Sequence, residues 1–97
     1  MKIDEFIMSI IRKIESLKEG VIAYAYKDGN ENMTHTWYCV CLSDYEMYMN
    51  DKRFKALSKA WHTAGKAFGI KVIFAYCNPL EEKMGKLQYD GNLFLNV

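Results

Sequence analysis

One long apolar stripe near the start of the chain constrains the fold more than any other feature. Between residues 3 and 17, apolar side chains recur every three or four residues, which is the spacing of one face of an α-helix. The members of the stripe are Ile3, Phe6, Ile7, Ile10, Ile11, Ile14 and Leu17. A stripe this wide must be buried against a second layer, and Gly20 provides a stop signal. We therefore expect a helix that covers a sheet.

The segments after this helix are rich in β-branched and aromatic residues, which favour strands. The sequence predicts a strand over Val21–Lys27, a turn at residues 28–30 and a second strand over Met33–Leu42. These two strands should pair as an antiparallel hairpin. A third strand is predicted over Ile70–Tyr76, and a weakly alternating final strand or small hairpin over Leu87–Leu95.

A second long helix is predicted between the second and third strands, over Asp51–Phe68, with Asp51 as a cap. The apolar residues that share one of its faces are Phe54, Leu57, Trp61, Ala64 and Phe68. Just before it, Ser43 and Glu46 have the spacing of a capping box, in which Ser43 caps and Glu46 reaches back. That spacing predicts a short turn of helix ahead of the long one.

These elements combine into one α+β domain, of mixed α/β type, that spans residues 1–97. The expected order is α-β-β-α-β-short α-β, with the short helix starting at Asn78 and Pro79. The connection through the second long helix is a crossover, which makes the second and third strands parallel and the sheet mixed. We expect a two-layer sandwich with both long helices on one face of the sheet.

The predicted strands are apolar on both faces, so a sheet with helices on one side leaves an aromatic and aliphatic second face. A homodimer mate, a partner protein, or the short helix and tail of the same chain would each cover it. Tyrosine and tryptophan favour interfaces because they bring large contact area at little entropic cost. The residues that we expect to contact a partner or a second copy are Tyr24, Tyr26, Trp37, Tyr38, Tyr45 and Tyr48.

The formal net charge of +1 excludes a global field that would gather nucleic acid or an anionic membrane. Locally, however, cationic residues recur at steps of three and four along the second long helix. They are Lys52, Lys55, Lys59, His62 and Lys66, and we call them the basic stripe. The basic stripe contains no acid and lies opposite the apolar face of the helix. It predicts either contact with phosphate or an acidic protein surface, or an ordinary solvated helix face.

Three cysteines, Cys39, Cys41 and Cys77, without a secretory signal predict reduced thiols in the cytoplasm. On a strand, Cys39 and Cys41 lie about 7 Å apart. We therefore expect them not to share a zinc ion, because each sulfur ligand of zinc lies at about 2.3 Å from the metal. His35 lies roughly 13 Å from Cys39 along the same strand and cannot activate it. The sequence thus predicts buried or interface cysteines, with no metal and no cofactor.

The two clusters of acidic residues are explained more simply by helix capping than by catalysis. Asp44 and Glu46 follow a strand, whereas nucleotidyltransferase sites place paired acids near a strand start after a Gly-Ser turn. Residues 81–83, Glu-Glu-Lys, fall on a predicted short helix. A nuclease site of the Asp…Glu-x-Lys type instead needs its acids on adjacent strands. Helix capping accounts for both clusters, and the chain has no glycine-rich phosphate-binding motif.

Together these features favour a small, non-enzymatic cytoplasmic protein that binds, inhibits or regulates through protein contacts. The composition suggests an accessory protein of a phage or mobile element. A nucleic-acid-binding protein that uses the basic stripe is the first alternative. The second is a small or degenerate enzyme, nucleotidyltransferase- or nuclease-like, in which His35, His62, a cysteine or Asp44 would converge. No apolar run reaches the roughly 18 residues of a membrane span, so no membrane partner is expected.

Overall fold

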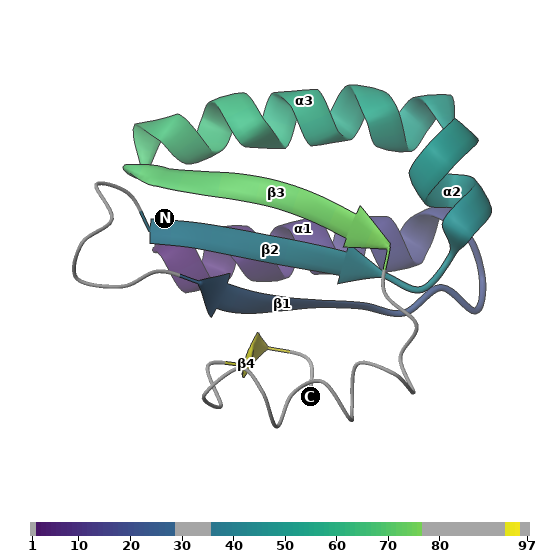
Figure 1. The fold of residues 1–97 in the computed structure, drawn as a ribbon, viewed down its shortest axis with the longest axis horizontal. Helices are drawn as coiled ribbons and strands as arrows, with labels where there is room; N and C mark the ends of the chain where they lie inside the picture. Colours follow the sequence, from purple (N-terminus) through teal and green to yellow (C-terminus); the bar gives the residue numbers. More distant parts are fainter. Residues whose placement is uncertain (1, 29–35, 77–92, 96–97) are drawn as a thin grey trace.

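The computed structural model describes residues 2–28, 36–76 and 93–95 (Figure 1). Its elements are α1 (Ile3–Leu17), β1 (Ala23–Asp28), β2 (Thr36–Leu42), α2 (Tyr45–Asn50), α3 (Lys52–Ala67), β3 (Ile70–Tyr76) and β4 (Leu93–Leu95). The predicted α+β class is confirmed, and the order of these elements agrees with the prediction. The predictions for His35, Cys77 and the short helix at Asn78 lie outside the described residues.

The strands form one mixed sheet in the order β3-β2-β1-β4. Strands β1 and β2 pair antiparallel, as the hairpin prediction requires. Strand β3 runs parallel to β2 along its whole length, from Thr36 beside Ile70 to Leu42 beside Tyr76. Strand β4 pairs antiparallel with the other side of β1. The crossover prediction is thus confirmed, and β3 lies at one edge of the sheet.

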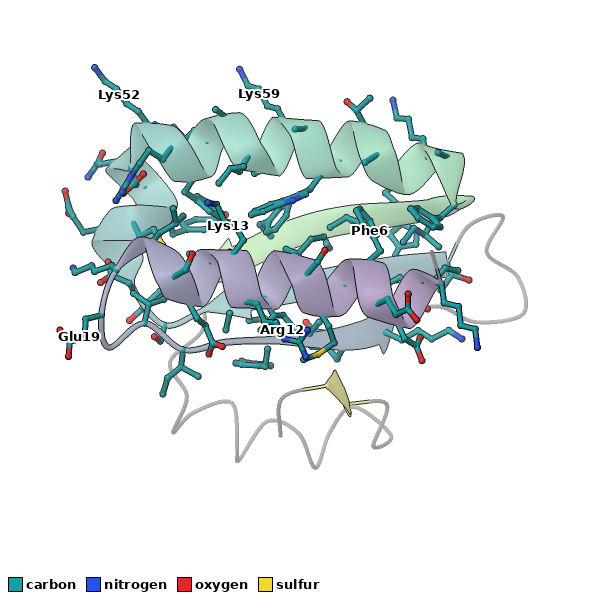
Figure 2. All side chains as sticks on the ribbon, turned by 180° about the vertical axis from the view of Figure 1, so that it is seen from behind. Phe6, Arg12, Lys13, Glu19, Lys52 and Lys59 are labelled. Atoms are coloured by element: carbon teal, nitrogen blue, oxygen red, sulfur yellow. The ribbon has the colours of Figure 1, made fainter. Side chains whose placement is uncertain are left out.

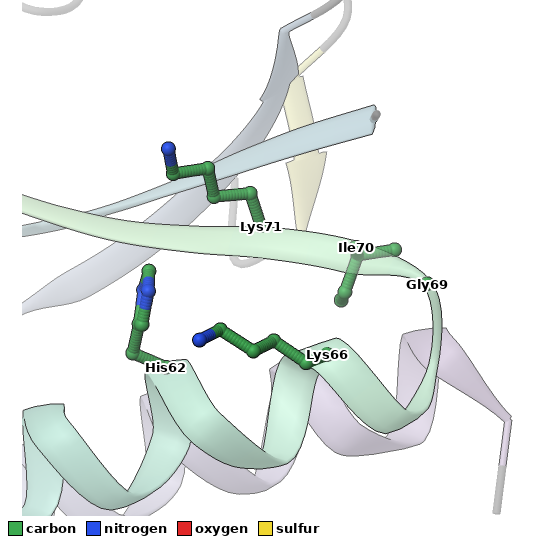
Figure 3. Close-up of a pocket in the computed structure, with 5 residues that line it drawn as sticks. All are labelled: His62, Lys66, Gly69, Ile70 and Lys71. Carbon is green, nitrogen blue, oxygen red and sulfur yellow. The ribbon is translucent and has the colours of Figure 1, made fainter. Parts of the chain in front are cut away.

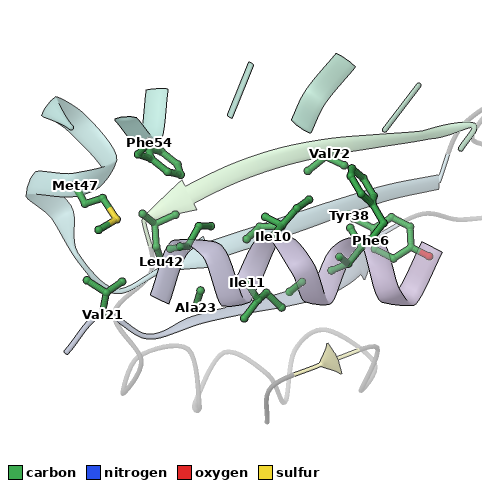
Figure 4. Close-up of a cluster of buried hydrophobic side chains, with 14 of the residues drawn as sticks. Phe6, Ile10, Ile11, Val21, Ala23, Tyr38, Leu42, Met47, Phe54 and Val72 are labelled. Carbon is green, nitrogen blue, oxygen red and sulfur yellow. The ribbon is translucent and has the colours of Figure 1, made fainter. Parts of the chain in front are cut away.

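Both long helices pack on the same face of the sheet and enclose the main hydrophobic core (Figures 1 and 4). The periodic stripe of α1 forms its centre, where Ile7, Ile10, Ile11 and Ile14 are fully buried. The opposite side of α1, with Arg12 and Lys13, is exposed (Figure 2). The two-layer arrangement follows because an amphipathic helix and a sheet each have an apolar side to bury.

Aromatic rings join the second long helix to the rest of this core. Phe6 of α1 stacks on Phe68, which directly follows α3, with ring centroids 4.8 Å apart. The rings of Phe54 and Trp61 on α3 pack against the ring of Phe74 on β3, with centroids 5.5 and 5.8 Å apart, respectively. Offset and edge-on ring pairs of this kind add to the stabilisation from buried area. They hold α3 against β3 and so fix the position of the outer side of α3.

Two aspartates start the helices that follow β2. The Asp44 carboxylate accepts hydrogen bonds from the Met47 N–H and from Lys18 Nζ, both at 2.8 Å. The Asp51 carboxylate accepts from the Phe54 N–H at 3.0 Å. Each satisfies a backbone donor that the first turn of a helix leaves without an intrahelical partner.

The prediction that Ser43 caps the first of these helices is wrong. Ser43 Oγ instead accepts a hydrogen bond from the Ile22 N–H at 2.9 Å, which ties the start of β1 to the end of β2. Glu46 does not reach back either, because its carboxylate accepts from the Asn50 side chain at 2.7 Å. Asp44 is favoured as the cap because its carboxylate also pairs with Lys18 from the end of α1.

We expect the stability contributed by these two aspartates to depend on pH. The Lys18 ammonium and the Met47 N–H lower the pKa of Asp44 from its ordinary 3.8, and the Phe54 N–H and Arg53 lower that of Asp51. A carboxyl whose pKa is lowered by folding stabilises the fold above its unfolded-state pKa. This stabilisation is lost as the pH falls through the folded-state pKa.

The double variant Asp44→Asn/Asp51→Asn keeps an oxygen at each cap but removes the charge. It should be less stable than the wild type at about pH 6, and the difference should shrink toward about pH 2. Urea unfolding at both pH values measures it. A difference that stays the same at the two pH values would contradict the assignment.

Candidate functional site

Helix α3 presents a row of cationic side chains along its outer side. Lys52, Lys55, Lys59 and Lys66 are all exposed, and Lys52 and Lys59 point away from the sheet in Figure 2. The helix holds five of the 13 lysines and arginines of the chain and none of the 12 acids. The rest of the chain is left with eight cations against 12 acids. The small net charge therefore conceals a strongly uneven distribution.

His62 does not face solvent with these lysines, so the prediction is wrong for its imidazole. The ring is half-buried and turns toward β3, where Nδ1 lies 3.0 Å from the carbonyl oxygen of Val72. Because a carbonyl can only accept, Nδ1 carries the proton and donates, and in the neutral ring Nε2 is then an acceptor. His62 thus joins α3 to the edge of the sheet.

Two cavities open where α3 and β3 meet, and both include His62. The first has a volume of about 360 Å³ and is lined by His62, Lys66, Gly69, Ile70 and Lys71 (Figure 3). The second has a volume of about 510 Å³ and is lined by Ser58, Lys59, His62, Thr63, Val72, Ile73 and Phe74. We call the residues that line these two cavities the α3–β3 seam. Figure 3 shows His62 and Lys66 reaching from α3 toward β3.

Lys71 leaves β3 on the side away from His62 (Figure 3). Its Nζ lies 4.3 Å from the centroid of the Trp37 ring, in a cation–π contact. The parallel register sets Trp37 directly beside Lys71. The alternation of side chains along two adjacent parallel strands was the sequence signal that could have identified this pair.

The predicted aromatic surface is divided between the two faces of the sheet. Tyr38 is 4% exposed and belongs to the helix-covered core, so it is not available to a partner. Burial raises the pKa of its phenol, and the Asp4 carboxylate acts in the same direction. Tyr24, 5% exposed, and the half-buried Tyr26 lie on the opposite face with the cysteines. The predicted set therefore does not form one continuous surface.

The exposed large apolar residues of the described part lie near the end of the sheet where β2 and β3 finish and β1 begins. They are Ile22, Tyr45, Met49 and Tyr76. We call Tyr45, Met49 and Tyr76 the apolar end patch, whereas Ile22 alternates with the core residues Val21 and Ala23 and so faces the other side of the sheet. The Tyr45 and Tyr76 rings meet edge-on with centroids 5.3 Å apart. Met49 follows Tyr45 by one helical turn. Of these residues only Tyr45 was expected, because the others come together through the tertiary fold.

The remaining predicted tyrosine, Tyr48, lies on α2 but turns inward. Its hydroxyl donates to the carbonyl oxygen of Phe74 at 3.4 Å, and its ring lies 6.3 Å from that of Phe54. Tyr48 and His62 therefore both contact backbone carbonyls of β3.

The prediction that strand spacing keeps the two central cysteine sulfurs apart is wrong. Cys39 Sγ and Cys41 Sγ are 3.9 Å apart, because the side chains lean toward one another along the strand. Both are at most 4% exposed, in a cluster with Tyr24, Tyr26 and Ile73. Burial among apolar groups disfavours the thiolate that metal binding or nucleophilic attack requires. The cysteines are packing residues of the second face.

The groups that an enzyme would need are not brought together among the described residues. His62 lies with α3 on the helix-covered side, whereas Cys39 and Cys41 face the other way, so the sheet separates them. Asp44 is engaged as a helix cap by Met47 and Lys18. The predicted acid cluster at residues 81–83 lies outside the described residues.

In residues 2–28, 36–76 and 93–95, no three His, Cys, Asp or Glu side chains are grouped so that they could hold a metal ion. The helices of this same part are too short or too polar to cross a membrane. Comparison of the chain with models of protein families, with curated proteins and with solved structures found no match.

Proposed function

We propose that this chain is a small non-enzymatic protein of the cytoplasm that binds, inhibits or regulates a partner protein. The observation that carries the proposal is the apolar end patch, in which exposed tyrosine and methionine side chains gather at one end of the sheet. Exposed apolar side chains that cluster, rather than scatter singly, mark interaction sites. Tyrosine and methionine are also enriched in interface cores. The composition extends the proposal to an accessory role in a phage or mobile element.

The apolar end patch rests on elements that are held in place. The Asp44 cap fixes the start of α2, and the hydrogen bond from the Ile22 N–H to Ser43 Oγ fixes the strand ends below it. The edge-on contact between Tyr45 and Tyr76 orients both rings. A partner therefore has to order few side chains on this surface, which reduces the entropic cost of binding.

A second copy of the chain is one form that this partner can take. In a symmetric dimer the same surface serves both subunits, and the apolar end patch would then face itself across a two-fold axis. Sedimentation of the purified chain measures this directly, since a dimer formed through the patch should dissociate when Tyr45 and Tyr76 are replaced by alanine.

Nucleic-acid binding is the second candidate, and the charge distribution favours it. Lys52, Lys55, Lys59 and Lys66 extend along α3 over about 21 Å, with no acid in the helix. A row of this kind can neutralise several phosphates, and its affinity would fall steeply with salt because counterions are released. The local row of charge, not the net charge of the chain, would produce the attraction.

Affinity capture from the source cell separates the two candidates. The wild-type chain should retain a partner protein equally with and without nuclease treatment. Tyr45→Ala/Tyr76→Ala should weaken retention at least about tenfold, because buried tyrosines are frequent interface hot spots. Lys55→Glu/Lys59→Glu/Lys66→Glu should instead abolish the retention of nucleic acid, if that is what the chain binds.

Two control variants make the comparison specific. Tyr45→Phe/Tyr76→Phe keeps the apolar area and should keep the partner protein. Lys2→Glu/Lys13→Glu/Lys27→Glu makes the same change of charge away from α3 and should keep any nucleic acid. Retention that disappears with nuclease, or that survives the loss of both tyrosine rings, would contradict the protein-binding proposal.

A further inference from the structure

Two side chains of α3, Lys66 and His62, face the smaller cavity of the α3–β3 seam. They are four residues apart, so they lie one helical turn from each other on the same side of the helix. Figure 3 shows the Lys66 side chain extending along the cavity with its nitrogen turned toward the His62 ring. Lys66 forms no ion pair with the part of the chain that the structure describes, and no acid is among the described residues that line the cavity. Within this part, the cavity therefore has a positive lining without a fixed counterion.

The hydrogen bond between His62 and Val72 leaves one nitrogen of the imidazole for a ligand. Nδ1 donates to the Val72 carbonyl at 3.0 Å. Nε2 lies on the other side of the ring and points away from this carbonyl. When an imidazole takes up a proton, as histidines do near neutral pH, Nε2 becomes a second donor and the bond to Val72 is retained. An anion can thus gain a charged donor without any rearrangement of α3 or β3.

The charged groups around the imidazole favour a dianion. Besides Lys66, the described charged residues that line the two cavities are Lys59 and Lys71, and Lys71 is directed away from His62 to the Trp37 ring. A protonated His62 and Lys66 together offer two positive charges. A phosphate monoester matches them, because it carries about −1.5 to −2 charge at pH 7 and three acceptor oxygens. A carboxylate or a phosphodiester carries only one negative charge.

The cavity is accessible to a small ligand. Lys66 is exposed and His62 is half-buried, so a ligand can enter past these side chains without reaching the edge of β3 that α3 covers. Its volume of about 360 Å³ lies in the range of small-molecule sites, which is about 300–1,000 Å³. The backbone carbonyls of Gly65 and Lys66 at the end of α3, which would repel an anion, accept hydrogen bonds at 3.0 Å from the N–H groups three residues on.

We propose that this cavity binds the phosphate group of a small phosphate monoester between Lys66 and His62. The Lys66 ammonium pairs with one phosphate oxygen, and the protonated imidazole donates from Nε2 to another while Nδ1 stays on Val72. The proton on Nε2 comes from the solvent, so binding is coupled to proton uptake. This site goes beyond the proposed partner binding and does not depend on it. It gives the chain a small ligand in addition to a partner protein.

Calorimetric titration of the full chain with three defined anions tests the site. The probes are glycerol 3-phosphate, adenosine 5′-monophosphate and dimethyl phosphate, with the amide chemical shifts of Lys66, Gly69 and Ile70 as a second readout. Both monoesters should bind with a Kd of about 1 mM or below and shift these amides. Dimethyl phosphate, a diester with one charge, should bind at least about tenfold more weakly. Tighter binding of the nucleotide would identify a nucleotide as the source of the phosphate, and equal affinity a simpler phosphorylated metabolite.

The pH dependence of binding separates the roles of the two side chains. Between about pH 6.5 and about pH 8.5, the affinity of the wild type for glycerol 3-phosphate should fall at least about tenfold, because the imidazole is protonated in the complex. His62→Asn keeps a side-chain N–H for Val72 but lacks Nε2, so it should bind more weakly at the lower pH and show no such fall. Lys66→Gln should weaken binding at least about tenfold at both pH values and keep the fall, whereas Lys66→Arg should bind like the wild type.

Lys52→Gln is the matched control, because it removes the same charge from the opposite end of α3. It should change the affinity by less than about twofold, since exposed charges at this distance are screened by salt. Failure of both monoesters to bind, equal binding of dimethyl phosphate, an unchanged affinity in Lys66→Gln, or a pH dependence that persists in His62→Asn would each overturn the inference. None of these results bears on the partner protein, whose retention is tested by Tyr45→Ala/Tyr76→Ala.

Discussion

Replacement of Ile10 by alanine is expected to lower the free energy of unfolding by about 2–5 kcal/mol. Ile10 is fully buried between α1 and the sheet, at the centre of the core in Figure 4. The loss combines the transfer energy of the removed methyl and methylene groups with the cavity that they leave. In a small domain this is a large share of the total stability, which is typically about 5–15 kcal/mol. Urea unfolding followed by circular dichroism measures the change.

Ile22→Ala is the matched control, since it removes the same atoms from a side chain that is 49% exposed. Its hydrogen bond to Ser43 comes from the backbone N–H and survives the substitution. We expect a change within about 0.5 kcal/mol. Equal losses from Ile10→Ala and Ile22→Ala would mean that the core is not where the structure places it.

Replacement of Gly65 by leucine is expected to lower the free energy of unfolding by about 2–3 kcal/mol, because α3 lies directly against β3 there. A Cβ atom at Gly65 would lie 2.9 Å from Val72 Cγ2 and 3.5 Å from the Ile70 carbonyl oxygen. Glycine inside a helix is about 1 kcal/mol less favourable than alanine, so its presence reflects this approach. A larger residue must push α3 away from the sheet or displace the buried Val72.

The control for this substitution is Ala60→Leu, which introduces the same side chain at an exposed position of α3. It should change the unfolding free energy by no more than about 0.5 kcal/mol. A Gly65→Leu protein as stable as the wild type would show that the two elements are farther apart than described.

Much of the fold could be predicted because its signals are local. The apolar period over residues 3–17 gives the bounds of α1, and the β-branched run Ile70–Tyr76 gives those of β3. The choice between Ser43 and Asp44 as a cap could not be made locally. It depends on Lys18, which is 26 positions away in the sequence. Strand β1 starts two residues later than predicted, at Ala23, and the Ile22 N–H just before it bonds to Ser43.

The candidate sites depend still more on contacts between distant segments. The basic stripe followed from helical spacing, but the inward turn of His62 required knowledge that β3 lies beside α3. The apolar end patch joins residues from α2 and from the end of β3, which are about 30 positions apart in the sequence. The sulfur atoms of Cys39 and Cys41 lie 3.9 Å apart because the two side chains lean toward each other. The prediction considered only the rise of the backbone along the strand. Each of these features needs the tertiary structure and not periodicity alone.

The uneven charge of the chain also affects how it meets other molecules. Helix α3 carries five cations and no acid, so its outer side is locally positive although the net charge of the chain is only +1. In the field of an anionic partner such a molecule turns before contact, so that α3 arrives first. The rate of association with an anionic partner would therefore depend on ionic strength even though the whole chain is nearly neutral.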